Sequence, residues 1–374
     1  MLTNKNDSNY KVIKIFTVGD EYLNEVIWYI EKARFSIEIE SYIFENCEAS
    51  AVLFKALDKA VHRGVVVRLM VDGFGSMTSI SQLMNITNEI KIQFKVYHPM
   101  YYWPRVFKWN KRNHRKIFLI DDQIAFLGSY NVSKVHFSFN NENPWQDLGI
   151  LIQGDSVKEI KKSFNHLWES KRVKYKNLIT PKIFKFSKKI QYLIRNKPIR
   201  INTHWYLRLF YWLDLLRRIR FAENRIYIMN AYFIPHRTFL KNLIKASQRG
   251  VEVVLVLPDK TDVPIVKWAT PILYKRLLKE NIKIFEYSRA ILHTKSLIID
   301  DWAIIGSHNL NHRSLIHDLE CEAVVSAKDK LLDLLNFFKI LRNESDEVKK
   351  ENLKRLSLLA WLKYRFALLF KYFI

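Results

Sequence analysis

Apolar residues near the start of the chain follow a helical spacing in two segments and a strand spacing in two others. The predicted elements are, in order, a helix over residues 22–33, a strand over 35–44, a helix over 49–63 and a strand over 65–71. Gly64 follows the second helix directly, as glycine often does at a helix end, and precedes a β-branched strand. Helices that alternate with strands in this way predict an α/β fold.

The same order of elements returns in the second half of the chain. The elements predicted there are a helix over residues 214–222, a strand over 225–233, a helix over 238–249 and a strand over 251–257. Gly250 takes the place of Gly64 at the end of the second helix. This internal repeat predicts two pseudo-symmetric α/β domains, each a mixed β-sheet flanked by helices.

A polar hairpin follows the first set of elements. Residues 113–131 read NHRKIFLIDDQIAFLGSYN, a pattern typical of two short strands joined by a turn. His114 and Lys116 are two residues apart, so their side chains share one face of a strand. With Ser129 and Asn131 at the far end of the partner strand, they predict a site for one anion, most simply a phosphate. For a single copy, a hairpin with a solvated polar edge is an equal alternative.

A second hairpin argues against a chance match. Residues 292–309 read LHTKSLIIDDWAIIGSHN and place His293, Lys295, Ser307 and Asn309 at the equivalent positions, with a turn that is one residue shorter. Both hairpins therefore carry their histidine and lysine in an HxKxxxxD array. If the two domains pack about a pseudo-twofold axis, the arrays meet in one composite active site at the domain interface.

Acidic residues accompany each array. Asp121 and Asp300 complete the arrays but lie at the hairpin turns, facing away from the anion site, so we interpret them as structural. A further acid follows each hairpin, Asp147 after the first and Glu320 after the second. A carboxylate that accepts the Nδ1 proton of a histidine leaves Nε2 free for chemistry. We therefore expect each of these acids to support the array that precedes it; a solvated acid at a strand end is the alternative.

Composition indicates a globular protein with a polyanionic partner. The chain has 374 residues, 49% of them hydrophobic, and a net charge of +24. Nucleic acid and an anionic membrane surface are the usual partners of such a charge, which alone does not choose between them. Two cysteines are too few for a disulfide framework or a zinc site. We expect no signal peptide and no membrane-spanning helix, because no uninterrupted run of about 18 apolar residues occurs.

Three segments bear on the choice of partner. Residues 170–213 contain no Asp or Glu but twelve Lys or Arg interleaved with aromatic residues, which suits an anionic lipid headgroup layer. Single-stranded nucleic acid or a merely solvated linker are the alternatives. Residues 353–374 are apolar around most of a helix yet interrupted by charges, which predicts an interfacial helix or a tail folded onto the protein. The aromatic loop 100–109 is a third candidate for lipid contact.

These features divide the chain into four parts. They are an N-terminal domain with the first array over residues 1–169, a basic aromatic linker over 170–213, a C-terminal domain with the second array over 214–345, and an amphipathic membrane-interfacial tail over 346–374. Each domain has an ordinary size for a fold with its own core.

The paired arrays with their trailing G-S-x-N resemble the phospholipase D superfamily, and the surrounding segments are similar to bacterial cardiolipin synthases. The segments that carry the resemblance are ESYIF (40–44), VDGFGS (71–76), NAYFIP (230–235) and GSHNLNHRSLIHDLE (306–320). The resemblance is closest to shorter members that lack an N-terminal transmembrane pair. The chain departs from the family in its shorter second turn, in GSYN where many members have two glycines, and in Gln146, where arginine is frequent.

The resemblance implies two phospholipase D-like domains and a two-step phosphatidyl transfer through a phosphohistidine, without a metal or other cofactor. It assigns His114 as nucleophile and His293 as general acid/base, with the reverse assignment left open. Lys116 and Lys295 would stabilise the negative charge of the transition state. The remaining candidates for phosphate binding are Ser129, Asn131, Ser307 and Asn309.

The resemblance also implies substrates and a location. The acceptor would be phosphatidylglycerol, and the donor phosphatidylglycerol or phosphatidylethanolamine, with glycerol or ethanolamine released. The phosphatidyltransferase would bind peripherally to the cytoplasmic face of the bacterial inner membrane, and nucleic acid is not expected as a partner. Two alternatives stay open: a phospholipase D or nuclease that uses water as acceptor, and a non-catalytic basic membrane- or nucleic-acid-binding protein. The second is disfavoured because both arrays retain every chemical group.

Overall fold

The fold was analysed in a computed structural model, which describes residues 10–100, 111–170 and 188–352 together with Leu362 and Phe366. The aromatic loop and the interfacial helix predicted near the C-terminus lie almost wholly outside the described residues. So does part of the predicted basic linker, residues 171–187.

The N-terminal domain consists of one sheet with helices packed against it. Its elements are, in chain order, β1 (Lys11–Phe16), α1 (Gly19–Lys32), β2 (Ser36–Ser41), α2 (Glu48–His62), β3 (Val66–Asp72), α3 (Ile80–Glu89), β4 (Gln93–Tyr97), β5 (Ile117–Ile120), β6 (Ile124–Gly128), η1 (Lys134–His136), β7 (Gly149–Gln153) and α5 (Val157–Glu169).

The C-terminal domain repeats this arrangement. Its elements are α6 (Lys188–Arg195), β8 (Ile199–Ile201), α7 (Trp205–Arg220), β9 (Arg225–Asn230), α8 (Arg237–Gln248), β10 (Glu252–Pro258), α9 (Pro264–Lys279), β11 (Lys283–Tyr287), β12 (Lys295–Ile299), β13 (Trp302–Gly306), α10 (His312–Ile316), β14 (Cys321–Val325), α11 (Lys328–Asn343), β15 (Ser345–Glu347) and η2 (Lys350–Asn352).

Both sheets are mixed, and their strand orders match apart from one additional edge strand, β15. The first sheet runs β1-β7-β6-β5-β2-β3-β4, and the second, listed from the equivalent edge, runs β8-β14-β13-β12-β9-β10-β11-β15. β2, β3 and β4 are parallel to one another, as are β9, β10 and β11. The antiparallel hairpins β5–β6 and β12–β13 lie directly beside β2 and β9. The predicted fold class, two pseudo-symmetric α/β domains with mixed sheets, is confirmed.

The predicted elements of the repeat are all present, and some elements cross the boundaries expected between the four parts of the chain. α7 begins at Trp205, so the boundary expected after residue 213 falls inside a helix. β8 pairs with β14, and therefore part of the predicted linker belongs to the second sheet. β15 pairs with β11 and extends the C-terminal domain into the predicted tail. The start of α7 was missed because its apolar side chains lie on both faces, with Trp205 and Leu209 exposed, which obscures the helical spacing.

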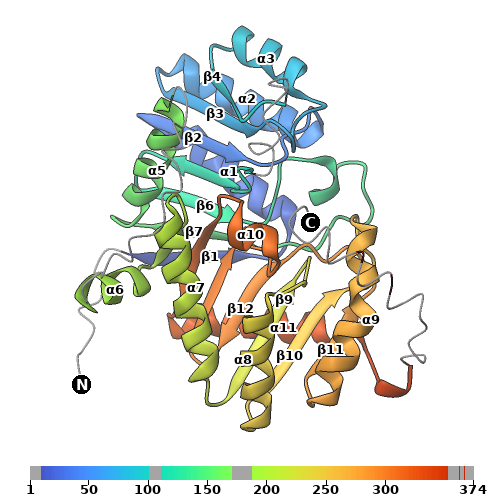
Figure 1. The fold of residues 1–374 in the computed structure, drawn as a ribbon. Coiled ribbons are helices and arrows are strands. Elements are labelled where there is room, and N and C mark those ends of the chain that lie inside the picture. The colour runs from blue at the N-terminus through green and yellow to red at the C-terminus, as the bar shows by residue number, and fades with distance from the viewer. Residues whose placement is uncertain (1–9, 101–110, 171–187, 353–361, 363–365, 367–374) are drawn as a thin grey trace.

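The two domains share a core. Leu119 and Ile150 of the first sheet pack in one cluster with Val256 and Ile305 of the second, and side chains of α5 and α11 join this cluster. The outer face of the first sheet packs against α1 and α2, and that of the second against α7 and α8. Figure 1 shows the two domains one above the other with these helices outside. Both hairpins therefore end at the junction of the domains.

The aspartates of the arrays tie each hairpin turn to its own sheet. Asp121 accepts hydrogen bonds from the backbone N–H groups of residues 34–36, at 2.8–3.0 Å, just where β2 begins. Asp300 accepts three equivalent bonds from residues 223–225, at the start of β9. Both aspartates have φ of +49°, a left-handed conformation that Asp tolerates better than most residues. These contacts support the structural interpretation of both residues.

We expect the substitution Asp300→Ala to lower the free energy of unfolding by roughly 1–3 kcal/mol, because three backbone donors lose their acceptor. Partial burial would raise the pKa of Asp300, but the three N–H donors hold it below its ordinary value. The stabilisation is therefore present above the pKa of the unfolded chain and is lost as pH falls through the lower folded pKa. Urea unfolding at pH 7 and pH 3 measures both effects. Equal stability of the two proteins at pH 7 would contradict this role, and Asp300→Asn, which keeps an acceptor oxygen, is the matched control.

Candidate active site

Two short backbone pairings join the domains at the arrays. The amide of His114 donates to the carbonyl of Leu319 at 3.0 Å, within an isolated parallel bridge. The amide of His293 donates to the carbonyl of Gln146 at 2.9 Å, beside a second parallel bridge. Leu319 and Gln146 immediately precede the two supporting acids in the chain. Each histidine is therefore aligned with the acid of the other domain.

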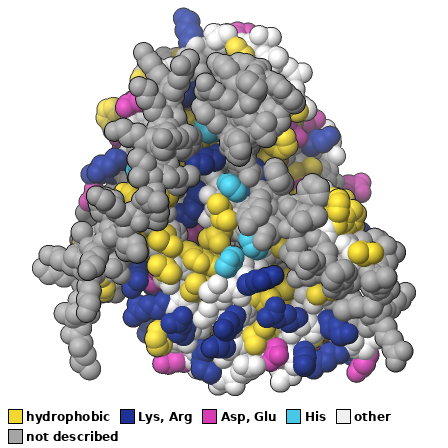
Figure 2. Space-filling view, viewed as in Figure 1, with side chains coloured by type: hydrophobic (Ala, Val, Ile, Leu, Met, Phe, Trp, Pro, Cys, Tyr) yellow, Lys and Arg dark blue, Asp and Glu magenta, His cyan; other side chains and the backbone are white. Residues whose placement is uncertain are grey.

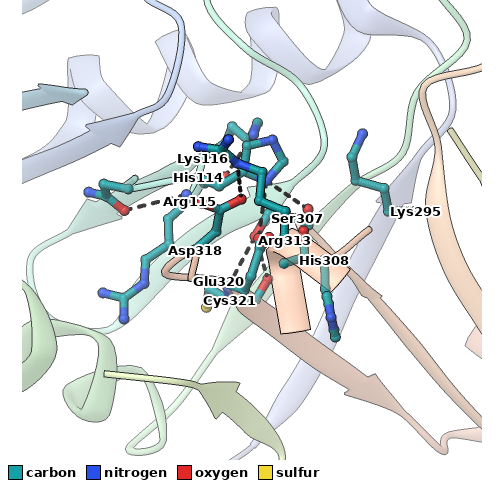
Figure 3. Close-up of polar contacts among 12 residues, drawn as sticks. His114, Arg115, Lys116, Lys295, Ser307, His308, Arg313, Asp318, Glu320 and Cys321 are labelled. Atoms are coloured by element: carbon teal, nitrogen blue, oxygen red, sulfur yellow. Dashed lines mark hydrogen bonds and ion pairs between the residues drawn. The ribbon is translucent and has the colours of Figure 1, made fainter. Parts of the chain in front are cut away.

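The carboxylates consequently cross between the domains. His114 Nδ1 lies 3.0 Å from the carbonyl oxygen of Ser307 and 3.2 Å from Glu320 Oε2 (Figure 3). His293 Nδ1 lies 3.1 and 3.0 Å from the two carboxylate oxygens of Asp147. This corrects the expectation that each acid supports the array preceding it. The acids sit at the start of β7 and β14, and the packing of the two sheets turns each toward the opposite domain.

The contacts assign the imidazole tautomers. A carbonyl oxygen only accepts hydrogen bonds, so His114 must carry its proton on Nδ1, which it shares between Ser307 and Glu320. The carboxylate of Asp147 likewise accepts the Nδ1 proton of His293. In both residues Nε2 keeps its lone pair for chemistry.

Glycine is required in both G-S pairs by close packing. A Cβ on Gly128 would lie 2.3 Å from the carbonyl oxygen of Leu148, and one on Gly306 would lie 2.3 Å from that of Cys321. These carbonyls belong to the residues that directly follow Asp147 and Glu320. The glycines thus allow the acid-bearing strand to approach the hairpin. This contact explains the glycines without reference to phosphate.

Three of the four predicted phosphate-binding side chains are engaged with the protein. Ser129 Oγ bonds to the backbone of Leu148, and Ser307 Oγ donates to Glu320. Asn131 accepts a hydrogen bond from the amide of Ile43 and donates to His136, each through its carboxamide. Asn309 is buried, and its Oδ1 is without a hydrogen-bond partner among the described residues. Phosphate binding by Ser129, Asn131, Ser307 and Asn309 stays a prediction.

The two lysines of the arrays are buried, and their charges act on each other. Lys116 and Lys295 are each 2% exposed, and each donates to the carbonyl of the histidine two residues earlier. Burial, and then the neighbouring charge of Lys295, lower the pKa of Lys116 to about 7. Burial lowers the pKa of Lys295 to about 8. Two buried lysines whose charges oppose each other favour the binding of an anion near both.

We expect anion binding at this site to take up protons. An anion restores the charged forms of Lys116 and Lys295, so affinity for tungstate, a phosphate mimic, should fall as pH rises from 7 to 9. Isothermal titration calorimetry in two buffers of different ionisation enthalpy measures the proton uptake directly. Constant affinity across this range without proton uptake would contradict a site between the two lysines, and Lys116→Met should remove most of the pH dependence.

Burial also governs the charge of the histidines. It lowers the pKa of His293 to about 3 against the opposing effect of Asp147, and it lowers the pKa of His114 with the help of Lys116. Burial alone would raise the pKa of Asp147, but its contacts with His293 and His136 outweigh this and hold the pKa well below its ordinary value. Both imidazoles are therefore neutral at pH 7, and His293 contacts a firmly ionised carboxylate.

Sequence reasoning missed three residues of the site. The rings of Tyr42 and Tyr232 lie beside the imidazoles of His114 and His293, with centroids 4.9 and 6.2 Å apart. Both tyrosines fall in segments that carry the family resemblance, ESYIF and NAYFIP, which was the available signal. His136 lies with Nδ1 2.6 Å from Asp147, and no pattern in the chain pointed to it.

Within the part of the chain that the structure describes, His136, Asp147 and His293 form a group that could hold a metal ion. Their ligand atoms lie within 4.8 Å of one another and all three side chains are buried. The same atoms already form direct contacts of 2.6–3.1 Å with one another. We interpret the group as a set of polar contacts that orients His293, because a metal would have to replace these contacts.

Comparison with known proteins identifies the family. A sequence profile described as "Cardiolipin synthase, PLD-like domain" matches residues 26–168 and 215–342, which together make up most of the chain. The chain belongs to this family. The resemblance noted from the paired arrays is therefore confirmed, and the expected enzyme class, a phosphatidyltransferase of the phospholipase D type, agrees with it.

Curated proteins that are similar to this chain are named cardiolipin synthases. The chain is 29% identical to a cardiolipin synthase of Staphylococcus aureus (strain Mu50), over 97% of this chain and 72% of that one. It is 30% identical to cardiolipin synthase B of Escherichia coli (strain K12), over 84% of this chain and 76% of that one. The similarity therefore extends over most of the length of both relatives.

Solved structures share the fold. A phosphatidylserine synthase of Haemophilus influenzae superposes with a TM-score of 0.70 at 13% identity, covering 98% of this chain and 95% of that one. A polyphosphate kinase of Porphyromonas gingivalis superposes with a TM-score of 0.59 at 15% identity, covering 96% and 56%. Within the described ranges, the helices are too short or too polar to cross a membrane.

Proposed function

We propose that the protein synthesises cardiolipin by transferring a phosphatidyl group from one phospholipid to the hydroxyl of phosphatidylglycerol through a phosphohistidine. The observation that carries this proposal is the pair of buried imidazoles, each with Nδ1 on a carboxylate of the other domain and each next to a lysine. One imidazole can attack phosphorus while the other carries the proton of the alcohol.

In the first step, Nε2 of His114 forms a bond to phosphorus, and the bond from phosphorus to the oxygen of the leaving alcohol breaks. The bound phosphate anion favours a protonated His293, which gives its Nε2 proton to that oxygen. Glycerol leaves as a neutral alcohol, or ethanolamine when phosphatidylethanolamine is the donor. Lys116 and Lys295 stabilise the negative charge on the oxygens of the transition state.

In the second step, a hydroxyl of phosphatidylglycerol gives its proton to Nε2 of His293 while its oxygen attacks phosphorus. The phosphorus–nitrogen bond then breaks and His114 is restored. Asp147 stabilises the imidazolium form of His293 that exists before the first step and forms again in the second. The roles of the two histidines follow the family resemblance, and the pseudo-symmetric contacts also allow the reverse.

Peripheral binding to the cytoplasmic face of the inner membrane is the second part of the proposal. Trp205, Leu209 and Leu213 are exposed at four-residue intervals along α7, and the exposed Arg217 continues the row. Figure 2, which has the same viewpoint as Figure 1, shows many Lys and Arg side chains on this face of the molecule, with hydrophobic side chains beside them. Apolar side chains flanked by cations favour an anionic lipid surface.

Purified protein incubated with phosphatidylglycerol vesicles tests the proposed reaction. Cardiolipin and free glycerol should appear in equal amounts, and mass spectrometry of the lipids measures the first. Phosphatidic acid without cardiolipin would show that water is the acceptor and would reject the synthase reaction. Adding phosphatidylethanolamine and measuring ethanolamine release distinguishes the two donors.

A further inference from the structure

A group of basic side chains, which we call the rim, lies around the backbone that precedes Glu320, on the side of His114. Its members are Lys111, Arg208, Arg313 and His317, all half-buried, and the proposed reaction gives none of them a role. They come from three segments that are far apart in the sequence: the approach to the first array, α7, and α10 with its C-terminal end. Arg313 lies within the close-up of the site in Figure 3.

Backbone and side-chain contacts bring these residues together. The isolated bridge between Asn113 and Leu319, with the bond from the amide of Leu319 to the carbonyl of Arg112, brings the segment of Lys111 beside that of His317, and the charge of Lys111 acts on His317. Arg208 Nη2 donates to the carbonyl oxygen of Asp318 at 2.9 Å, and Arg313 Nε donates to the carboxylate of Asp318 at 3.0 Å. The cations therefore gather around one turn of the backbone, two residues before the acid that supports His114.

The charges of this group act on one another. Burial and then Arg208 lower the pKa of Lys111. Burial, followed by Arg208, Arg313 and Lys111, lowers the pKa of His317 to about 4. Arg313 also lowers the pKa of His114. Positive charge thus accumulates at this rim, and an anion bound there would relieve it.

The rim on the side of His293 has a different charge. There the hydroxyl of Tyr232 donates to Asp262 at 2.7 Å, and Lys267 donates to Glu286 at 3.0 Å. Each of these polar contacts involves an acidic group, whereas around Asp318 the cations Lys111, Arg208 and Arg313 outnumber its one carboxylate. The two sides of the pseudo-symmetric site therefore differ in their balance of charge.

We propose that Lys111 and Arg208 form a subsite for the phosphodiester of the acceptor phospholipid, the phosphate that is not cleaved. The inference rests on the proposed function, because phosphatidylglycerol brings a second anionic headgroup to the site whereas water or a simple alcohol does not. A short glycerol unit joins the attacking hydroxyl to this phosphate, so both phosphates must be bound together. Lys116 and Lys295 hold the reacting phosphate, and the rim holds the other.

A competition between two acceptors tests the subsite. Phosphatidylglycerol vesicles in buffer containing ethanol offer one donor and two acceptors, so cardiolipin and phosphatidylethanol form in the same tube. In Lys111→Gln the ratio of cardiolipin to phosphatidylethanol should fall roughly five- to tenfold, and further in Lys111→Gln with Arg208→Gln. Arg208→Lys, which keeps the charge, should retain more of the ratio than Arg208→Gln. The matched control is Lys241→Gln on α8, an exposed position outside the rim.

Two results would overturn the subsite. An equal fall of both products would place the effect on the first chemical step or on folding. A fall in cardiolipin that follows weaker sedimentation with the vesicles would make the rim a general membrane contact.

A binding measurement keeps the subsite testable apart from the reaction. With tungstate filling the position between Lys116 and Lys295, glycerol 1-phosphate should still bind the unaltered protein, and Lys111→Gln should weaken that binding roughly fivefold. Protein that binds in this way but makes no cardiolipin would reject the proposed function and keep the subsite. Absent binding, or equal binding by Lys111→Gln, would reject the subsite itself.

Discussion

Replacing His114 with alanine is expected to abolish phosphatidyl transfer, with kcat lower by about 10⁴-fold or more. The substitution removes the Nε2 atom that bonds to phosphorus, and His293, the other imidazole with Nδ1 on a carboxylate, is needed for proton transfer. Cardiolipin formed from phosphatidylglycerol vesicles, measured by mass spectrometry, gives the rate. His293→Ala should also lose turnover, because the leaving alcohol then has no proton donor.

Trapping the intermediate distinguishes the two histidines. Acid-labile phosphohistidine should be detected in the unaltered protein after rapid quenching and should be absent from His114→Ala. His62→Ala is the matched control, because His62 is an exposed histidine at the end of α2. Turnover by His114→Ala within tenfold of the unaltered protein, or an adduct on His293, would refute the assignment of His114 as nucleophile.

Asp147→Asn is expected to lower kcat by about 10²–10⁴-fold while leaving the fold intact. The carboxylate holds His293 in the Nδ1–H tautomer and stabilises its protonated form, whereas a carboxamide can present its N–H₂ and favour the wrong tautomer. Asp147 opposes the effect of burial on the pKa of His293. Its neutralisation should therefore lower that pKa and move the acid limb of the pH–rate profile to lower pH.

The crossed pairing makes this result specific. In Asp147→Asn, nuclear magnetic resonance should show a changed Nδ1–H signal for His293 and an unchanged one for His114. Glu320→Gln, the matched substitution in the other domain, should show the reverse. A shift of the His114 signal in Asp147→Asn would mean that each acid supports the array that precedes it. The pairing of each histidine with the acid of the other domain would then be wrong.

Local features of this protein were readable from the sequence because they depend on neighbours in the chain. The spacing of His114 and Lys116 on one strand, the hairpin turn, and the glycine at each helix end all follow from backbone geometry over a few residues. The structural role of Asp121 was predictable for the same reason, since a turn aspartate readily adopts a left-handed conformation. Repetition of these patterns then predicted the two domains.

Composition and single polar side chains were weaker guides than spacing. The boundary after residue 213 was placed by charge and aromatic content, yet α7 runs through it and β8 belongs to the second sheet. Three of the predicted phosphate-binding side chains lie where their hydrogen bonds are already used by the protein. A serine or asparagine after a glycine serves strand packing and ligand binding equally well in a sequence.

By itself, the sequence determined the candidate catalytic groups: two histidines and two lysines in repeated hairpins, with an acid following each. Only the tertiary structure decided how they combine. His293 meets an acid 146 residues away, and His114 meets one 206 residues away, because the shared core packs the two sheets so that each acid-bearing segment pairs with the other domain's histidine. The place of His136 against Asp147, and the cationic rim near His114, follow from the same packing. Contacts of this kind depend on the relative position of two domains, which hydrophobic spacing along the chain does not encode.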